Sequence, residues 1–166
     1  MTVIRSYRDF CDETHFEYKD YQHAGVSFCK NVETNTRWRG GLVADEMGLG
    51  KTIMMLGLIT CNFKDRTLIV LPLALLHQWQ STIHKHLGHK PLVFHGQMAK
   101  KCTKQQLEKS PIVLTTYGKL ASPVPRKGKP PPPPRPCILK SITWNRVIFD
   151  EGHHLRNAKT GRHQGA

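Results

Sequence analysis

Four short apolar runs, separated by segments of helix length, constrain the fold of this 166-residue chain more than any other feature. Continuous β-branched runs of this kind are typical of strands buried on both faces of a sheet. The segments 51–63 and 75–87 are predicted helices, and the first 39 residues are expected to be helical in part. Alternating strands and helices predict an α/β fold with a parallel sheet and right-handed crossovers. The predicted strands are GGLVA (40–44), TLIVL (67–71), IVLTT (112–116) and RVIFD (146–150).

Composition narrows the classes of protein to which the chain can belong. Hydrophobic residues make up 39% of the sequence, enough for a globular core. No apolar run approaches the ~20 residues that cross a bilayer, and the first residues lack the apolar stretch of a secretory signal. None of the five cysteines forms a C-x-x-C pair, which argues against a zinc site or a disulfide framework. We therefore expect no membrane partner and a reducing compartment, the cytosol or the nucleus.

The net charge of +13 is concentrated in one part of the chain. Residues 64–140 contain 14 lysines and arginines but only two acidic residues, Asp65 and Glu108, so this stretch carries +12. Such asymmetry favours a polyanionic partner, with nucleic acid as the first candidate. A solvated basic surface is the alternative that charge alone leaves open.

A proline-rich segment interrupts the pattern of strands and helices. Residues 122–136 read SPVPRKGKPPPPPRP, and proline lacks the N–H that a helix or a central strand requires. We expect an exposed polyproline II insertion loop over 121–137. Pro130, Pro133 and Arg135 match the P-x-x-P-x-R spacing that SH3 grooves accept, although a basic spacer loop explains the same residues with fewer assumptions.

The sequence ADEMGLGKT at 44–52 resembles a phosphate-binding loop, whose general pattern is G-x-x-x-x-G-K-[ST]. Gly50, Lys51 and Thr52 fit the end of the pattern, whereas Asp45 replaces its first glycine. In such a loop the free N–H groups at the start of a helix face the phosphates. The lysine reaches the β and γ phosphates, and the threonine hydroxyl binds Mg²⁺.

A pair of acids at the end of the last apolar run provides the second half of a nucleotide site. The sequence RVIFDEGHH at 146–154 brings Asp150 and Glu151 to the carboxyl edge of the predicted sheet, where ligands of α/β folds bind. Asp150 is suited to the Mg²⁺ shell, and Glu151 to orienting or deprotonating the attacking water. Such acid pairs also cap helices, so the assignment depends on the loop at 44–52.

Several motifs, in the right order, resemble those of the Swi/Snf-related ATPases of helicase superfamily two. The upstream segment YKDYQHAGVSF resembles the family's entry segment, in which a glutamine reads the adenine edge, and Gln22 occupies that position. The sequence DEGH at 150–153, followed by LRN, resembles the RING-finger-bearing Swi/Snf-like branch linked to DNA damage tolerance and transcription. The resemblance covers residues 16–160 and implies the first RecA-like lobe of a DNA-dependent ATPase. The segments that match motifs I, Ia, Ib and II read GGLVADEMGLGKT, TLIVLPLALLHQW, IVLTTYGKL and ITWNRVIFDEGHHLRN.

The resemblance implies the residues that would bind ATP and Mg²⁺. Lys51, Asp150 and Glu151 would be catalytic, and Thr52 and Asp150 would hold the Mg²⁺ ion. His153 matches the motif II histidine, which couples the ATP site to neighbouring motifs. The expected nucleotide-binding residues are Gln22, Glu46, Met47, Gly48, Leu49, Gly50, Lys51, Thr52 and His153.

The resemblance also implies contacts with DNA and explains the acid in the loop. Motif Ia, around 72–79, and motif Ib, at 115–118, would contact the backbone of one DNA strand without reading its sequence. The family replaces the first glycine of the loop as a rule. We therefore expect the Asp45 carboxylate to point away from the phosphates, toward Arg37 or Arg39.

Two further features allow more than one interpretation. Trp79 could stack on a base, but packing of a helix on the sheet suits an apolar indole at this position better. His84, His86 and His89 could suggest a metal site. No cysteine or carboxylate lies at ligand spacing from them, which favours a surface role.

The family pattern also predicts how the chain is organised. Residues 1–15 are expected to form an N-terminal extension, and residues 16–166 a partial RecA-like lobe that is truncated after the Walker B strand. In the family, a second RecA-like lobe contributes an arginine to catalysis, and a motif III strand lies between the strands of motifs I and II. Both are absent from this chain, so we expect no competent ATPase from it alone. A non-catalytic nucleotide- and DNA-binding fragment is the alternative, and DEMGLGKT and LTTYG argue against an RNA-directed helicase.

Overall fold

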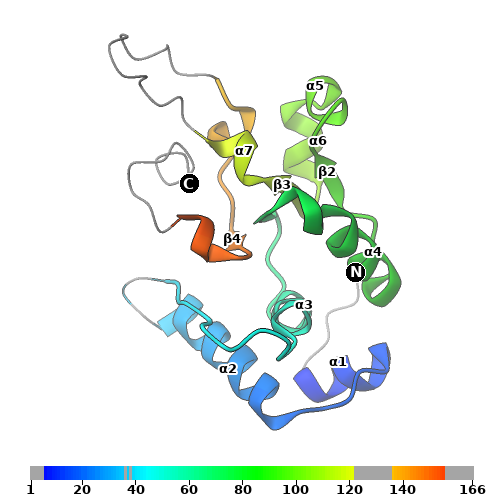
Figure 1. Ribbon diagram of the computed structural model, residues 1–166, viewed down its shortest axis with the longest axis vertical. Helices are drawn as coiled ribbons and strands as arrows, with labels where there is room; N and C mark the ends of the chain where they lie inside the picture. Colours follow the sequence, from blue (N-terminus) through cyan, green and yellow to red (C-terminus); the bar gives the residue numbers. More distant parts are fainter. Residues whose placement is uncertain (1–5, 36, 38, 122–135, 156–166) are drawn as a thin grey trace. The chain divides into compact units, whose positions relative to one another are not determined.

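The chain divides into two compact units, whose elements are drawn in Figure 1. The first unit comprises Met1–Phe63 and Lys85–His89, and the second comprises Lys64–His84 and Lys90–Ala166. The predicted proline-rich loop, with the SH3-type spacing inside it, lies almost entirely outside the described residues. In the part of the chain that is described, no helix is both long and apolar enough to cross a membrane. The computed structural model describes residues 6–35, 37, 39–121 and 136–155.

Helices provide the regular structure in the described part of the first unit, and the first of them has a strong start signal. The Ser6 hydroxyl accepts a hydrogen bond from the Asp9 N–H, and the Asp9 carboxylate accepts one from the Ser6 N–H, each at 3.1 Å. This capping box satisfies two N–H groups that would otherwise lack a partner. The helices are α1 (Tyr7–Thr14), α2 (Asp20–Asn35) and α3 (Lys51–Cys61).

Two glycines let α1 and α2 pack closely on α3. A Cβ atom at Gly57 would lie 2.7 Å from the Tyr7 ring, and one at Gly25 would lie 2.7 Å from the Met54 sulfur. Phe10 of α1 is fully buried in the same unit. α1 is therefore an integral layer of the first unit, while the domain boundary expected after residue 15 stays a prediction.

The strand predicted over 40–44 is wrong, because these residues form no regular structure. Gly41 lies against α2, where a Cβ atom would come within 3.1 to 3.3 Å of Val32 and Phe28, and Leu42 is 79% exposed. A strand needs a neighbouring strand to satisfy its backbone N–H and C=O groups. The described residues of the first unit offer no such neighbour, so the segment runs along a helix instead.

A four-stranded parallel sheet forms the centre of the second unit, with the strand order β2-β3-β1-β4. The α/β fold class with a parallel sheet is thereby confirmed. Every residue of β1 and β3 is buried, as predicted for strands covered on both faces. The last strand ends at Phe149, one residue before its predicted end. The strands are β1 (Thr67–Leu71), β2 (Leu92–Phe94), β3 (Ile112–Thr116) and β4 (Arg146–Phe149).

The parallel register aligns the carboxyl ends of the strands, and this positions the functional residues. Leu71 pairs with Thr116, and Val70 pairs with Phe149. The residues that follow β1, β3 and β4 therefore lie along one edge of the sheet. The helices of this unit are η1 (Leu73–Leu75), α4 (Leu76–Leu87, its last turn counted with the first unit), α5 (Met98–Lys101), α6 (Lys104–Lys109), α7 (Tyr117–Leu120), η2 (Ile138–Ser141) and η3 (Gly152–Leu155).

The chain enters and leaves the predicted proline-rich loop at neighbouring points. The Cys137 thiol donates a hydrogen bond to the Lys119 carbonyl oxygen at 3.3 Å. Leu120 and Leu139 belong to one buried cluster, which also contains Leu68 of β1. The two ends of the loop are thus held together by described residues.

We expect excision of residues 122–136, with a short glycine linker in their place, to leave the thermal midpoint and the nucleotide affinity nearly unchanged. The ends already meet, and closing a shorter loop has a small entropic cost. Thermal unfolding and nucleotide titration of the excised chain measure this. Deletion of residues 138–141 is the matched control and should destabilise the chain, because it removes Leu139, which is 1% exposed. Loss of a cooperative transition on the first excision would show that the segment belongs to the fold.

Candidate functional site

The loop before α3 has the backbone geometry of a phosphate cradle. Gly48 and Gly50 have φ angles of +88° and +77°, in the left-handed region that favours glycine. Gly50 is the N-cap of α3 and has no side chain that could cap the first N–H groups of the helix. These N–H groups and the positive end of the helix dipole can therefore face an anion.

Lys51 reaches back over this loop. Its ammonium group donates to the carbonyl oxygens of Asp45 and Glu46, each at 2.8 Å. An ammonium carries three N–H donors, so a third is left for a phosphate oxygen. Thr52 follows in the first turn of α3, while Met47 is exposed at the tip of the loop.

Gln22 of α2 packs against the loop and is only 4% exposed. Its side-chain N–H donates to the Leu49 carbonyl oxygen at 3.1 Å, and its carbonyl oxygen accepts a hydrogen bond from the Tyr7 hydroxyl at 2.9 Å. One amide N–H and further acceptor capacity are left for an adenine edge, and that role of Gln22 stays a prediction. The structure adds that Gln22 connects α1 to the backbone of the phosphate loop.

Tyr7 is a site-supporting residue that the sequence did not reveal. Burial, above all, raises the pKa of its hydroxyl well above the usual range, so the group is a donor at every physiological pH. Its ring stacks on His23 and closes against Gly57. An aromatic residue 15 positions before a glutamine is no recognisable signal, and only the packing of α1 on α3 brings the two together.

The backbone of Asp45 takes part in the loop, because its carbonyl oxygen accepts a hydrogen bond from the Lys51 ammonium. Its side chain is exposed. The expected orientation of the Asp45 carboxylate toward Arg37 or Arg39 stays a prediction.

In the second unit, Asp150 follows β4 and is held at four points. Its N–H donates to the Val70 carbonyl at 2.9 Å, which extends the ladder to β1 by one residue. Its carboxylate accepts from the Glu151 N–H at 3.0 Å through Oδ1 and from the Trp79 indole N–H at 2.7 Å through Oδ2. The Tyr117 hydroxyl donates to the Asp150 carbonyl oxygen at 2.6 Å. The predicted Mg²⁺ ligand is thus fixed in both backbone and side chain.

Glu151 adopts a φ angle of +52°, which is rare for a residue with a side chain. Strained backbone of this kind costs on the order of 1–3 kcal/mol and is concentrated at functional sites. Its carboxylate lies 3.1 Å from Nδ1 of His153. At the carboxyl edge of the sheet, Glu151 therefore contacts both of the other predicted residues, Asp150 through its N–H and His153 through its carboxylate.

Motifs Ia and Ib differ in what they expose. Leu73, His77 and Gln78 are exposed on η1 and the first turn of α4, whereas Trp79 is 2% exposed and packs inward. In motif Ib, residues 115–117 are buried and only Gly118 is exposed. The Thr115 hydroxyl donates a hydrogen bond to the Phe94 carbonyl oxygen. The side chains of residues 115–117 therefore pack inside the unit, and any DNA contacts by motif Ib would come from its backbone.

The histidines at 84, 86 and 89 belong to no metal-binding cluster among the described residues. In the described residues, no group of three or more histidines, cysteines, aspartates or glutamates could hold a metal ion. The His86 ring packs 4.3 Å from the Phe16 ring, and burial lowers the pKa of His86 below its usual value.

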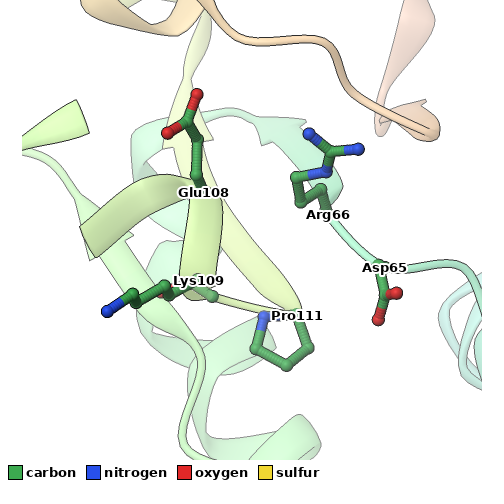
Figure 2. Close-up of a pocket in the computed structure, with 6 residues that line it drawn as sticks. Asp65, Arg66, Glu108, Lys109 and Pro111 are labelled. Carbon is green, nitrogen blue, oxygen red and sulfur yellow. The ribbon is translucent and has the colours of Figure 1, made fainter. Parts of the chain in front are cut away.

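A pocket of about 350 Å³ lies at the opposite edge of the sheet, next to the amino ends of β1 and β3. Figure 2 shows that the charged groups on its walls point in different directions. Ligands of parallel sheets bind at the carboxyl ends of the strands. This pocket is therefore no candidate for the nucleotide. Its walls are Asp65, Arg66, Glu108, Lys109, Ser110 and Pro111.

Comparison with known proteins identifies the family. The family model described as the SNF2-related domain matches residues 21–166. The DNA repair protein RAD5 of Debaryomyces hansenii is 32% identical over 93% of this chain, and the transcription regulatory protein SNF2 of Saccharomyces cerevisiae is 29% identical over 86% of it. The chain spans only 15% and 8% of the lengths of these relatives.

A solved structure agrees with the fold. The Sulfolobus solfataricus SWI2/SNF2 ATPase core, determined in complex with double-stranded DNA, superimposes with a TM-score of 0.73 at 24% identity. The match covers 99% of this chain and 31% of that one, which shows the RecA-like fold. The chain belongs to the SNF2-related domain family.

Proposed function

We propose that this chain provides the ATP-binding lobe of a DNA-dependent ATPase that translocates on duplex DNA in chromatin remodelling, transcription or DNA repair. The observation that carries the proposal is the uncapped start of α3, preceded by two left-handed glycines and followed by Lys51. Backbone of this shape is built to receive a phosphate group. The family to which the chain belongs supports the same assignment.

The loop residues fit a triphosphate in charge and in donor number. The N–H groups of residues 47–52 would bind phosphate oxygens, and Lys51 would neutralise the β and γ phosphates with the donor that it does not use on the loop. Gln22 would meet the adenine through its remaining amide groups. Together these residues bind and orient the nucleotide.

The oxygen donors suit a hard cation such as Mg²⁺. Each predicted Mg²⁺ ligand, the Thr52 hydroxyl of the first unit and the Asp150 carboxylate of the second, offers an oxygen of the kind that Mg²⁺ prefers. When bound, the ion would neutralise the charge that develops on the phosphates. Glu151 would orient and deprotonate the attacking water, and His153, in contact with Glu151, would relay changes from neighbouring motifs.

Positive charge in the second unit supports a DNA partner. Exposed lysines lie on its short helices, among them Lys100, Lys101 and Lys104. Contacts between lysines and phosphates are independent of sequence. The relatives are named as DNA repair and transcription regulatory proteins, from which we propose a nuclear location for this chain as well.

Duplex DNA should stimulate phosphate release from ATP by the full natural chain that contains this domain, and the stimulation should fall steeply as salt rises. A protein that contacts 6–10 phosphates loses about 10³–10⁵ in affinity between 50 and 200 mM salt. Phosphate release, measured with duplexes of different sequence over a salt series, tests the proposal. Equal rates with and without DNA would refute it. ATP binding without turnover would instead favour a non-catalytic nucleotide- and DNA-binding module.

A further inference from the structure

We infer that Trp79 and Tyr117 are positioning residues that fix Asp150 for Mg²⁺ binding, an inference that rests on the proposed function. Both side chains are buried, at 2% and 3% exposure, although both lie in segments expected to contact DNA. Their polar atoms converge on one residue. The indole N–H donates to the Asp150 carboxylate at 2.7 Å, and the phenol donates to the Asp150 carbonyl at 2.6 Å.

The bond from Trp79 determines which way the carboxylate faces. A carboxylate can rotate about its last bond, and each of its oxygens accepts about two hydrogen bonds. In Asp150, Oδ1 accepts from the Glu151 N–H and Oδ2 accepts from Trp79, so donors on both oxygens stop this rotation. The unused lone pairs then keep a constant direction, as a metal ligand requires.

The bond from Tyr117 acts on the backbone at the point where the strand ends. The N–H of Asp150 still bonds to Val70, but Glu151 turns out of the strand with a φ angle of +52°. The phenol fixes the carbonyl oxygen between these two residues. It therefore keeps Asp150 in line with β4 and holds the turn that presents Glu151.

The two bonds also connect different elements to one acid. Trp79 lies on α4, after β1, and Tyr117 begins α7, after β3. A segment that packs only for stability does not need its polar atoms on a single partner. The convergence of both donors on Asp150 is what assigns them a part in metal binding.

The test compares Trp79→Phe with Trp144→Phe in the full natural chain. Trp144 is the matched control, because its indole lies in the same unit but donates at 2.9 Å to the Leu139 carbonyl and not to Asp150. Binding of Mn²⁺ in the presence of ADP is followed by the loss of the free-ion signal in electron paramagnetic resonance. The affinity for ADP without a divalent ion is measured alongside.

Trp79→Phe should weaken Mn²⁺ binding about 10-fold or more, the usual cost of losing a partner of a metal ligand, and should leave metal-free ADP binding unchanged. Tyr117→Phe should change the same quantity in the same direction, and Trp144→Phe should not change it. If Trp79→Phe and Trp144→Phe behave alike, the positioning role is wrong while the proposed function stands. If the unaltered chain binds ADP but no Mn²⁺ with it, both are wrong.

Discussion

Replacing Lys51 with alanine should weaken nucleotide binding by about 10- to 100-fold. The change removes the ammonium that can donate to the β and γ phosphates, and a hydrogen bond to a charged group is worth about 1.5–3 kcal/mol. The affinity is measured by titrating the chain with a fluorescent, non-hydrolysable ATP analogue. Lys109→Ala is the matched control, since it removes the same charge at the amino edge of the sheet and should leave nucleotide affinity unchanged.

Glu151→Gln separates binding from chemistry. The amide keeps the size of the side chain but cannot accept a proton, so turnover should fall by about 10²–10⁴ while the dissociation constant stays within about twofold. Single-turnover phosphate release by the full natural chain and the same nucleotide titration measure the two quantities. Equal losses of binding in the Lys51 and Glu151 variants would show that the two roles have been wrongly assigned.

Gly50→Ala should destabilise the first unit strongly and lower nucleotide affinity with it. An alanine at a φ angle of +77° costs about 1–2 kcal/mol in backbone strain. In addition, its Cβ would clash with the side-chain nitrogen of Gln22. That amide cannot move aside without breaking the bonds to Leu49 and Tyr7, so we expect a further loss of about 1–3 kcal/mol in unfolding free energy.

Gly48→Ala is the control that isolates this contact. Gly48 has a similar φ angle of +88°, but nothing lies within 4 Å of its would-be Cβ. Denaturant unfolding without nucleotide should therefore show the larger loss for Gly50→Ala. Adding Gln22→Ala should make the loss at Gly50 less than additive, since the clash disappears. Equal losses for the two glycines would mean that Gln22 yields freely.

The strands that are buried on both faces could be predicted, because such strands are continuous apolar runs in the sequence. β1 and β3 are continuous runs of β-branched and aliphatic residues, and such runs have few alternatives in a chain with intervening helices. β2 is three residues long, too short to stand out from its surroundings. The segment 40–44 has the composition of a strand, but composition does not reveal whether a neighbouring strand is there to pair with it.

The motifs of the candidate site can be recognised in the sequence, whereas the residues that hold them in position cannot. Gly50, Lys51, Asp150 and Glu151 are recognised because each motif is local in sequence. Tyr7 and Trp79 act over 15 and 71 positions, and neither spacing carries a pattern. Such partners are determined by packing between elements, so they become visible only once the fold is known.

The bond between Tyr7 and Gln22 bears on where this domain can be trimmed. The family match starts at residue 21, and α1 precedes it. A chain shortened to start at residue 16 would keep every residue of the phosphate loop, yet Gln22 would lose the donor to its carbonyl oxygen and α3 would lose the ring that covers Gly57. A minimal nucleotide-binding unit must therefore be chosen by the contacts that hold the loop in shape, and here the shortest useful chain starts with the cap of α1 at Ser6.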